Sequence, residues 1–203
     1  MAIDPQRSLP RSGDRMSIEE YFRLDYTAPD AKYEYQYGAV RLMAGDSGEH
    51  SEIAFHMRTA LKQRIRSDPY SVQGSDMRVQ VADDTYVFPD VTLSCDVADR
   101  RRGNKLIRSA RIVVEVLSPS TEKYDRTDKL KLYKAYPTIQ EIVLISQFAP
   151  HVEVYRRDEQ DSTIWHHTFY GPGQMVMLES VDVEIPLEEI YQDIDFDEPL
   201  SEE

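Results

Sequence analysis

The sequence predicts an α/β fold in which helices flank a central mixed β-sheet. The main observation is a strand, a helix and a second strand in succession between residues 111 and 146, because such a passage makes a right-handed crossover between parallel strands. Short turns join the other strand-like runs, which indicates antiparallel neighbours. The 203 residues suffice for one domain. We expect it at residues 16–191, after a disordered arm (1–15) and before an acidic tail (192–203).

The first part of the chain is expected to contain a helix, a hairpin and a second helix. Ser17 followed by Glu20 is typical of a capping box and predicts a short helix that begins there. Two strand-like runs within residues 32–43 predict an N-terminal β-hairpin. Apolar residues then recur at helical spacing over residues 48–67, and Pro69 is expected to close that helix.

The middle of the chain combines strands with a helix. Strand-like runs occupy residues 70–81, 86–95 and 111–118. The last of these runs is aliphatic on both faces, as a strand in the centre of a sheet should be. A helix at 121–136 follows and is stopped by Pro137. A further buried strand is expected at 141–146.

The last part of the chain is expected to form a C-terminal strand meander and a short helix. The strands are predicted at 151–157, 163–170 and 175–177, and the helix at 187–191. Beyond that helix the charged residues are all acidic, which is why we place the tail outside the domain.

Composition narrows the classes of function. Cys95 is the only cysteine, so no disulfide can form within the chain and a cysteine-based zinc site is excluded. The formal net charge of −13 disfavours a high-affinity nucleic-acid binder, although carboxylates that hold a cation contribute to it. The sequence shows neither a bilayer-spanning run nor a secretory signal, so we expect a cytoplasmic protein without membrane contacts.

Two carboxylates stand where apolar residues are expected. Glu115 lies in a run, 112–117, that should be buried on both faces, and an ionised carboxylate there needs a cation, a metal or a proton. Asp90 follows Pro89 among apolar neighbours, and a proline marks an irregularity in a strand. Carboxylates from two adjacent strands make the oxygen-rich site that Mg²⁺ or Mn²⁺ prefers. A buried ion pair at Glu115 and an ordinary turn at Asp90 are the simpler alternatives.

A lysine on the helix at 121–136 is expected to face these carboxylates. Lys129, Leu132 and Tyr133 share one stripe at helical spacing. Since the other two residues belong to the core face of that helix, Lys129 should point inward with them. Asp125 lies one turn earlier on the same side and is an accessory candidate. The alternative is a lysine that extends past the edge of the sheet, with Asp125 as its partner.

Four short segments carry a family resemblance. They are residues 33–38, 89–90, 114–121 and 125–133, and the run Glu-Val-Leu-Ser-Pro-Ser-Thr in the third is the most specific. Together they resemble the Uma2 family, formerly DUF820, whose members are described as restriction-endonuclease-like proteins of the PD-(D/E)xK nuclease superfamily. The resemblance extends over about residues 16–190. It implies a restriction-endonuclease-like core, with the hairpin and the meander as additions.

The resemblance also implies a function. It points to a metal-dependent endonuclease that hydrolyses phosphodiester bonds in DNA with Mg²⁺ or Mn²⁺. Asp90 and Glu115 would hold the metal, and Lys129 would orient a water or stabilise charge on the phosphate. Glu34 matches a family acid and is expected as a third ligand, with a solvent-facing strand acid as the alternative. His50 would contact a phosphate or order a water, unless it caps or packs the long helix. A homodimer is expected because the superfamily often forms one.

One departure from the superfamily leaves two other functions open. The signature lysine of the superfamily stands two positions after the glutamate, where this chain has Leu117, and Lys129 is the residue placed to replace it. If Lys129 pairs away from Asp90 and Glu115, the fold would serve as a non-catalytic binding or assembly module. A hydrolase of small phosphodiesters or nucleotides is the second alternative, because it tolerates an acidic surface better.

Overall fold

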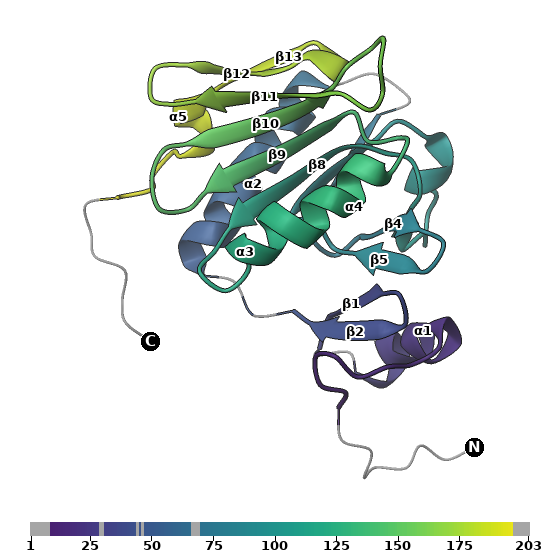
Figure 1. Cartoon of the computed structure of the whole chain (residues 1–203). Helices are drawn as coiled ribbons and strands as arrows, with labels where there is room; N and C mark the ends of the chain where they lie inside the picture. The colour runs from purple at the N-terminus through teal and green to yellow at the C-terminus, as the bar shows by residue number, and fades with distance from the viewer. Residues whose placement is uncertain (1–8, 29–30, 44, 46, 66–69, 197–203) are drawn as a thin grey trace.

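The strands form three sheets in the computed structural model, which describes residues 9–28, 31–43, 45, 47–65 and 70–196 (Figure 1). The largest sheet has the order β11 (Trp165–Tyr170), β10 (Val152–Arg157), β9 (Glu141–Ser146), β8 (Ala110–Leu117), β6 (Val91–Ser94) and β3 (Ser71–Gly74). The second has the order β2 (Ala39–Leu42), β1 (Tyr33–Gln36), β5 (Thr85–Val87), β4 (Arg78–Ala82) and β7 (Leu106–Ile107). The third is the pair β12 (Met175–Leu178) and β13 (Val183–Pro186).

The helices are short except for one. The α-helices are α1 (Ile18–Thr27), α2 (Gly48–Arg64), α3 (Glu122–Tyr124), α4 (Leu130–Ala135) and α5 (Leu187–Ile190). A π-helical turn, η2 (Asp125–Lys129), joins α3 to α4, so the three form one continuous helical segment. Two short 3₁₀ helices are η1 (Val97–Arg100) and η3 (Glu179–Val181). The predicted capping box at Ser17 and Glu20 is present at the start of α1.

The six-stranded sheet is mixed, as predicted. β8 and β9 are parallel and are joined by the helical segment α3–η2–α4. The other neighbours in this sheet are antiparallel. Helices cover both faces, with α4 in front of the sheet and α2 behind it in Figure 1. The predicted parallel pair with a helical connection is therefore confirmed.

The two faces of β8 bury different sets of residues. Val114 and Val116 pack in the apolar cluster that contains α2, whereas Val113 and Leu117 pack in the cluster that contains α4. Side chains alternate between the two faces of a strand. Glu115 therefore shares the face of Val113 and Leu117, and its carboxylate is directed toward the helical segment after β8.

Two predicted strands are each divided between two sheets, so those predictions were wrong. The run 70–81 is broken by a turn between β3 and β4, in which the Met77 amide donates to the Gly74 carbonyl. The run 86–95 is broken between β5 and β6 at Phe88, Pro89 and Asp90. Proline has no N–H to donate to a neighbouring strand. The chain thus leaves one sheet for the other at Pro89, and Asp90 lies at this crossing.

The N-terminal hairpin is confirmed, but it is not a separate addition. Its turn places Tyr37 at φ 48° and Gly38 at φ 89°, the conformation that two-residue hairpin turns need. β1 also pairs with β5, so the hairpin is the edge of the five-stranded sheet. The expected disordered arm is partly wrong, because the Gly13 amide donates to the Val40 carbonyl and Arg15 bridges to Ala39. Residues 1–8 lie outside the described residues.

The C-terminal meander differs from the prediction in its last strand. β10 and β11 pair as expected, but β12 pairs with β13, a strand that we did not predict. Val176, Leu178 and Ile185 are buried in the cluster that contains α2, so the β12–β13 pair covers the core instead of extending the sheet. The long helix ends at Arg64, and Pro69 lies outside the described residues. No helix in the described part of the chain has the length and apolar character needed to cross a membrane.

Candidate active site

Asp90 is held at the crossing between β5 and β6 by the neighbouring strand. Its Oδ2 accepts a hydrogen bond of 2.7 Å from the backbone amide of Val116, the residue that follows Glu115 in β8. Its Oδ1 lies 3.2 Å from Nε2 of His50. Because Pro89 interrupts the strand, Asp90 turns from the ladder toward β8. The two predicted carboxylates are therefore on adjacent segments, as the sequence indicated.

Glu115 is buried, and its neighbours act on its pKa in opposite directions. Oε1 accepts a hydrogen bond from the Tyr133 hydroxyl and lies 3.1 Å from Nζ of Lys129. Burial raises the pKa of Glu115 well above its ordinary range, and the Lys129 ammonium lowers it only in part. The negative charges of Asp125 and Asp90 raise the same pKa further. A cation bound near Glu115 would therefore stabilise the ionised form of this carboxylate.

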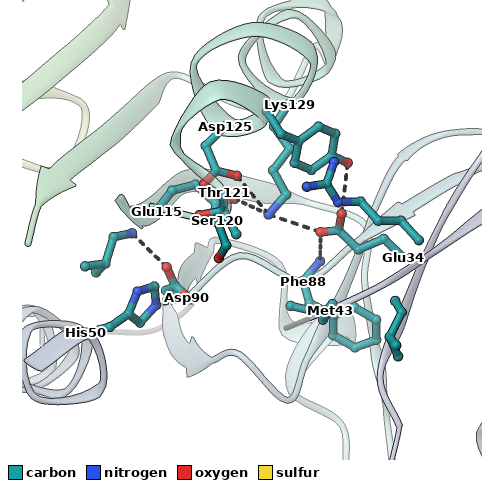
Figure 2. A pocket seen from close by; sticks show the side chains of 14 residues that line it. Glu34, Met43, His50, Phe88, Asp90, Glu115, Ser120, Thr121, Asp125 and Lys129 are labelled. Atoms are coloured by element: carbon teal, nitrogen blue, oxygen red, sulfur yellow. Dashed lines mark hydrogen bonds and ion pairs between the residues drawn. The ribbon is translucent and has the colours of Figure 1, made fainter. Parts of the chain in front are cut away.

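Lys129 lies between carboxylates from three segments, as Figure 2 shows. Its Nζ is 3.1 Å from Glu34, 3.1 Å from Glu115 and 3.5 Å from Asp125. Burial alone would lower the pKa of Lys129, but the carboxylates outweigh it and raise the pKa well above its ordinary range. The lysine points inward, as its stripe predicts. Asp125 is one of its partners, yet the side chain does not extend past the edge of the sheet.

Glu34 joins the hairpin to the rest of the site. Oε1 accepts a hydrogen bond of 3.3 Å from the Phe88 amide in addition to its ion pair with Lys129. Oε2 accepts a hydrogen bond of 2.9 Å from the Tyr124 hydroxyl. Burial, followed by the charge of Glu34, raises the pKa of Tyr124, so this hydroxyl stays a donor. The alternative of a solvent-facing acid was wrong, because Glu34 is buried.

His50 lies in the first turn of α2. Its backbone amide donates to the Ser47 side chain that caps the helix, and its ring faces Asp90. Figure 2 shows His50 and Asp90 together, on the other side of Glu115 from Glu34. The helix thus directs one imidazole toward a carboxylate, a position from which it can orient that carboxylate.

All six predicted site residues line one pocket of about 80 Å³. They form two groups. One gathers around Lys129 and contains Glu34, Glu115 and Asp125, and the other is the pair of Asp90 and His50. Other polar side chains of the lining come from Arg41, Ser120, Thr121 and Tyr124. The four carboxylates outnumber the cations of the lining, so the pocket is suited to a positively charged ligand.

Sequence reasoning missed three residues of the site, which are Arg41, Tyr124 and Tyr133. Arg41 lies opposite Glu34 in the hairpin, and its guanidinium stacks on the ring of Tyr124 at 3.6 Å. Counting residues outward from the predicted turn would have placed Arg41 beside Glu34. Tyr133 was assigned to the core, and only its position four residues after Lys129 hints that its hydroxyl reaches the site.

The donor groups fit a hard divalent cation at Asp90 and Glu115. Among the described residues, no three Asp, Glu, His or Cys side chains are arranged to hold a metal ion. Glu34 is the poorer ligand, because its two oxygens already face Lys129, the Phe88 amide and Tyr124. Mg²⁺ is commonly held by one or two carboxylates and keeps several waters. Two carboxylates that face one pocket satisfy this requirement.

Comparison with known proteins assigns the chain to a family. The model of the Uma2 family, described as "Putative restriction endonuclease", matches residues 18–188. The chain belongs to the Uma2 family. The similarity that the four short segments indicated is thereby confirmed.

Relatives of this Uma2 chain include two proteins of Synechocystis sp. and one solved structure. "Uncharacterized protein slr1290" is 30% identical over 197 residues, which are 97% of this chain and 100% of the relative. "Uncharacterized protein sll1609" is 28% identical over 144 residues, 70% of this chain and 81% of the relative. A crystal structure from Anabaena variabilis, described as "a putative nuclease belonging to DUF820", has a TM-score of 0.67 and 19% identity. The match covers 87% of this chain and 97% of the chain in that crystal structure. This likeness confirms the α/β nuclease-type fold.

Replacing Tyr133 with Phe is expected to destabilise this Uma2 chain in a pH-dependent way. Removal of the hydroxyl leaves a buried carboxylate oxygen of Glu115 short of a donor, at a free-energy cost of about 1–3 kcal/mol. It also raises the pKa of Glu115 further, and an acid with a raised folded-state pKa loses stability as the pH rises through that pKa. The loss should therefore be larger at pH 8 than at pH 5 in urea denaturation.

A matched control removes a second tyrosine hydroxyl beside the same helix. Tyr136 donates to the backbone carbonyl of Arg108 instead of a carboxylate. Tyr136→Phe should therefore lose the same stability at both pH values. An equal loss at both pH values for Tyr133→Phe would contradict the coupling to Glu115.

Proposed function

We propose that this Uma2 chain is a metal-dependent endonuclease that hydrolyses phosphodiester bonds in DNA. The observation that carries the proposal is the Lys129 ammonium 3.1 Å from the Glu115 carboxylate, in a pocket that also contains Asp90. A lysine from the following helix would thus take the role that the superfamily gives to a lysine on the strand. The descriptions of the family and of the solved relative support the same class of reaction.

The residues of the chain divide the work between binding and charge stabilisation. Asp90 and Glu115 would hold Mg²⁺ or Mn²⁺, which when bound activates a water and offsets negative charge on the phosphate. The Val116 amide fixes the orientation of Asp90. Lys129 would donate a hydrogen bond to a phosphate oxygen or to the attacking water. Glu34 keeps Lys129 charged and in place.

The same contact weakens the main alternative. A non-catalytic module would let Lys129 pair away from Glu115, whereas the ammonium bridges Glu115 and Glu34. Its side chain is also buried, and three carboxylates hold the ammonium in this position. A hydrolase of small phosphodiesters stays the second candidate, because the pocket of about 80 Å³ would admit a single phosphate group.

Nicking of supercoiled plasmid tests the proposal. The wild type is expected to nick DNA in Mg²⁺ or Mn²⁺ and to stop in EDTA. Asp90→Asn should lose this activity because the amide is a weaker metal ligand than the carboxylate. Asp128→Asn is the matched control, since Asp128 is an exposed acid of the same helical segment as Lys129. Its activity should equal that of the wild type.

The outcomes separate the candidate functions. If the wild type hydrolyses bis(p-nitrophenyl) phosphate but neither single- nor double-stranded DNA, the small-phosphodiester hydrolase replaces the nuclease. If it hydrolyses none of these substrates with either metal, the chain is a binding module. If Asp90→Asn retains full activity, Asp90 is not a metal ligand.

A further inference from the structure

A concentrated basic segment stands out on this acidic chain. Five cationic residues occur within residues 100–108, in a protein whose net charge is −13. They are Arg100, Arg101, Arg102, Lys105 and Arg108, and all five are exposed. We call this segment the basic loop. It connects β6 to β8 through η1 and β7.

A buried carboxylate beneath the basic loop fixes its backbone. Asp99 is buried, and its Oδ2 accepts hydrogen bonds of 2.7 Å from the Ser94 hydroxyl and 2.9 Å from the Ser109 amide. Its Oδ1 accepts one of 3.0 Å from the Arg108 amide. Both ends of the loop are therefore tied to one side chain, and its shape does not depend on the arginine side chains.

The middle of the basic loop is fixed by a second side chain. The amide nitrogen of Asn104 donates to the carbonyls of Asp99, at 2.8 Å, and Leu106, at 2.6 Å. Its oxygen accepts from the Leu106 amide at 3.2 Å. Gly103 has φ 82° and supplies the left-handed residue that the turn requires. Since the backbone is already ordered, binding a ligand here would lose little conformational entropy.

Three of the arginines are available for an anion. Arg101, Arg102 and Arg108 form no ion pair with any residue that the structure describes. They line an open hollow of about 440 Å³. The two acids of this hollow are engaged with the loop itself, because Asp96 accepts from the Ala98 amide and Asp99 from the backbone at the end of the loop. The planar guanidinium group matches the geometry of a phosphate and can bind it through two hydrogen bonds.

The basic loop lies at the opposite end of the β6–β8 pair from the pocket. Ser94 pairs with Ala110 at the loop end, and Val91 pairs with Val114 beside Asp90 and Glu115. Along β8, Ala110 at the loop end and Glu115 at the pocket are five residues apart, a distance of about 17 Å. The phosphates of one DNA strand advance about 3.4 Å per nucleotide along the helix axis. A duplex a few base pairs long therefore spans the distance between loop and pocket.

We propose that the basic loop is the surface on which the phosphate backbone of duplex DNA docks. The inference rests on the proposed function and adds the place where the substrate is held. It also resolves the conflict between a nuclease and a net charge of −13, because the positive potential is local. The acidic remainder of the surface would keep the duplex from binding elsewhere.

The test is binding of a fluorescein-labelled duplex by fluorescence anisotropy at several salt concentrations, in EDTA so that no cleavage occurs. The variant combines Arg101→Ala, Arg102→Ala and Arg108→Ala. A matched control with the same change of charge combines Arg23→Ala, Lys62→Ala and Lys131→Ala, three exposed positions elsewhere. Loss of three phosphate contacts should reduce the salt slope by about 3 and weaken binding on the order of a hundredfold at 0.1 M salt. The control should bind as the wild type does.

The possible outcomes of this experiment test the docking surface independently of the proposed nuclease activity. Equal loss in the two triple variants, or no binding by the wild type, overturns the docking surface. Tighter binding of a single strand than of the duplex overturns the choice of duplex. A loop variant that binds weakly but hydrolyses bis(p-nitrophenyl) phosphate at the wild-type rate supports it. If the wild type binds through the loop yet cleaves nothing, the docking surface stands and the nuclease proposal fails.

Discussion

Lys129→Met is expected to abolish DNA cleavage and to lower the free energy of unfolding by about 3–5 kcal/mol at neutral pH, the effect of removing one partner from a buried ion pair. The methionine is nearly isosteric but carries no charge, so Glu34, Glu115 and Asp125 lose the cation that they share. The stability loss should be measured by urea denaturation and the activity by plasmid nicking.

The pH dependence identifies the cause of this loss. Without the ammonium, the pKa of Glu115 rises above its already raised value in the folded protein. An acid whose pKa is raised in the folded protein stabilises the fold fully below its unfolded-state pKa. This stabilisation is lost as the pH rises through the folded-state pKa. The deficit of Lys129→Met should therefore shrink as the pH falls from 7 toward 4. Lys131→Met, at an exposed position of the next helix, should change stability little at any pH. A deficit that is constant with pH would point to lost packing.

Glu115→Gln is expected to reduce metal-dependent cleavage about a thousandfold, which corresponds to about 4 kcal/mol of transition-state stabilisation. The amide retains the size of the side chain and can accept the hydrogen bond from Tyr133. The variant also removes a buried acid whose pKa is strongly raised. We therefore expect the metal-free variant to be as stable as the wild type, so that activity is lost without unfolding.

Thermal denaturation with and without Mn²⁺ measures the other half of this prediction. A cation at 100 times its Kd stabilises the wild type by about 2.7 kcal/mol, and Glu115→Gln should lose this increment. Glu141→Gln is a suitable control because Glu141 is also buried, in the adjacent strand β9, where Ser180 hydrogen-bonds to it. Burial raises the pKa of Glu141 as well. If Glu141→Gln loses the metal effect too, or Glu115→Gln keeps it, the metal is not held at Glu115.

The sequence predicted those parts of the fold that local pattern determines. The run 112–117 is aliphatic on both faces, and β8 is indeed central in its sheet. The stripe of Lys129 and Tyr133 fixed the inward face of the helix, because helical spacing alone decides which residues share a side. A charged residue in such a place is conspicuous, so Glu115 could be identified without any structure.

Long-range partners could not be predicted in the same way. The runs 70–81 and 86–95 look continuous because apolar patterning does not reveal to which sheet a strand belongs. The π-helical turn at Asp125–Lys129 has no sequence signature that we recognise, yet its first and last residues, Asp125 and Lys129, both belong to the site. The basic loop was overlooked because net charge averages over the chain. Asp99 fixes the backbone of the loop that carries these arginines. Nothing in the sequence distinguishes Asp99 from the other acidic residues.

The attachment of the hairpin has a consequence for the proposed activity. β1 meets β5 through only two residue pairs, Tyr35 with Tyr86 and Gln36 with Thr85. Short ladders open at lower free energy than the core of a domain. If this edge opened, Glu34 would leave Lys129, whereas the apolar core of the six-stranded sheet contains no described residue of the hairpin. The activity proposed here would therefore depend on the hairpin staying paired with β5, because Glu34 reaches Lys129 from this edge of the five-stranded sheet.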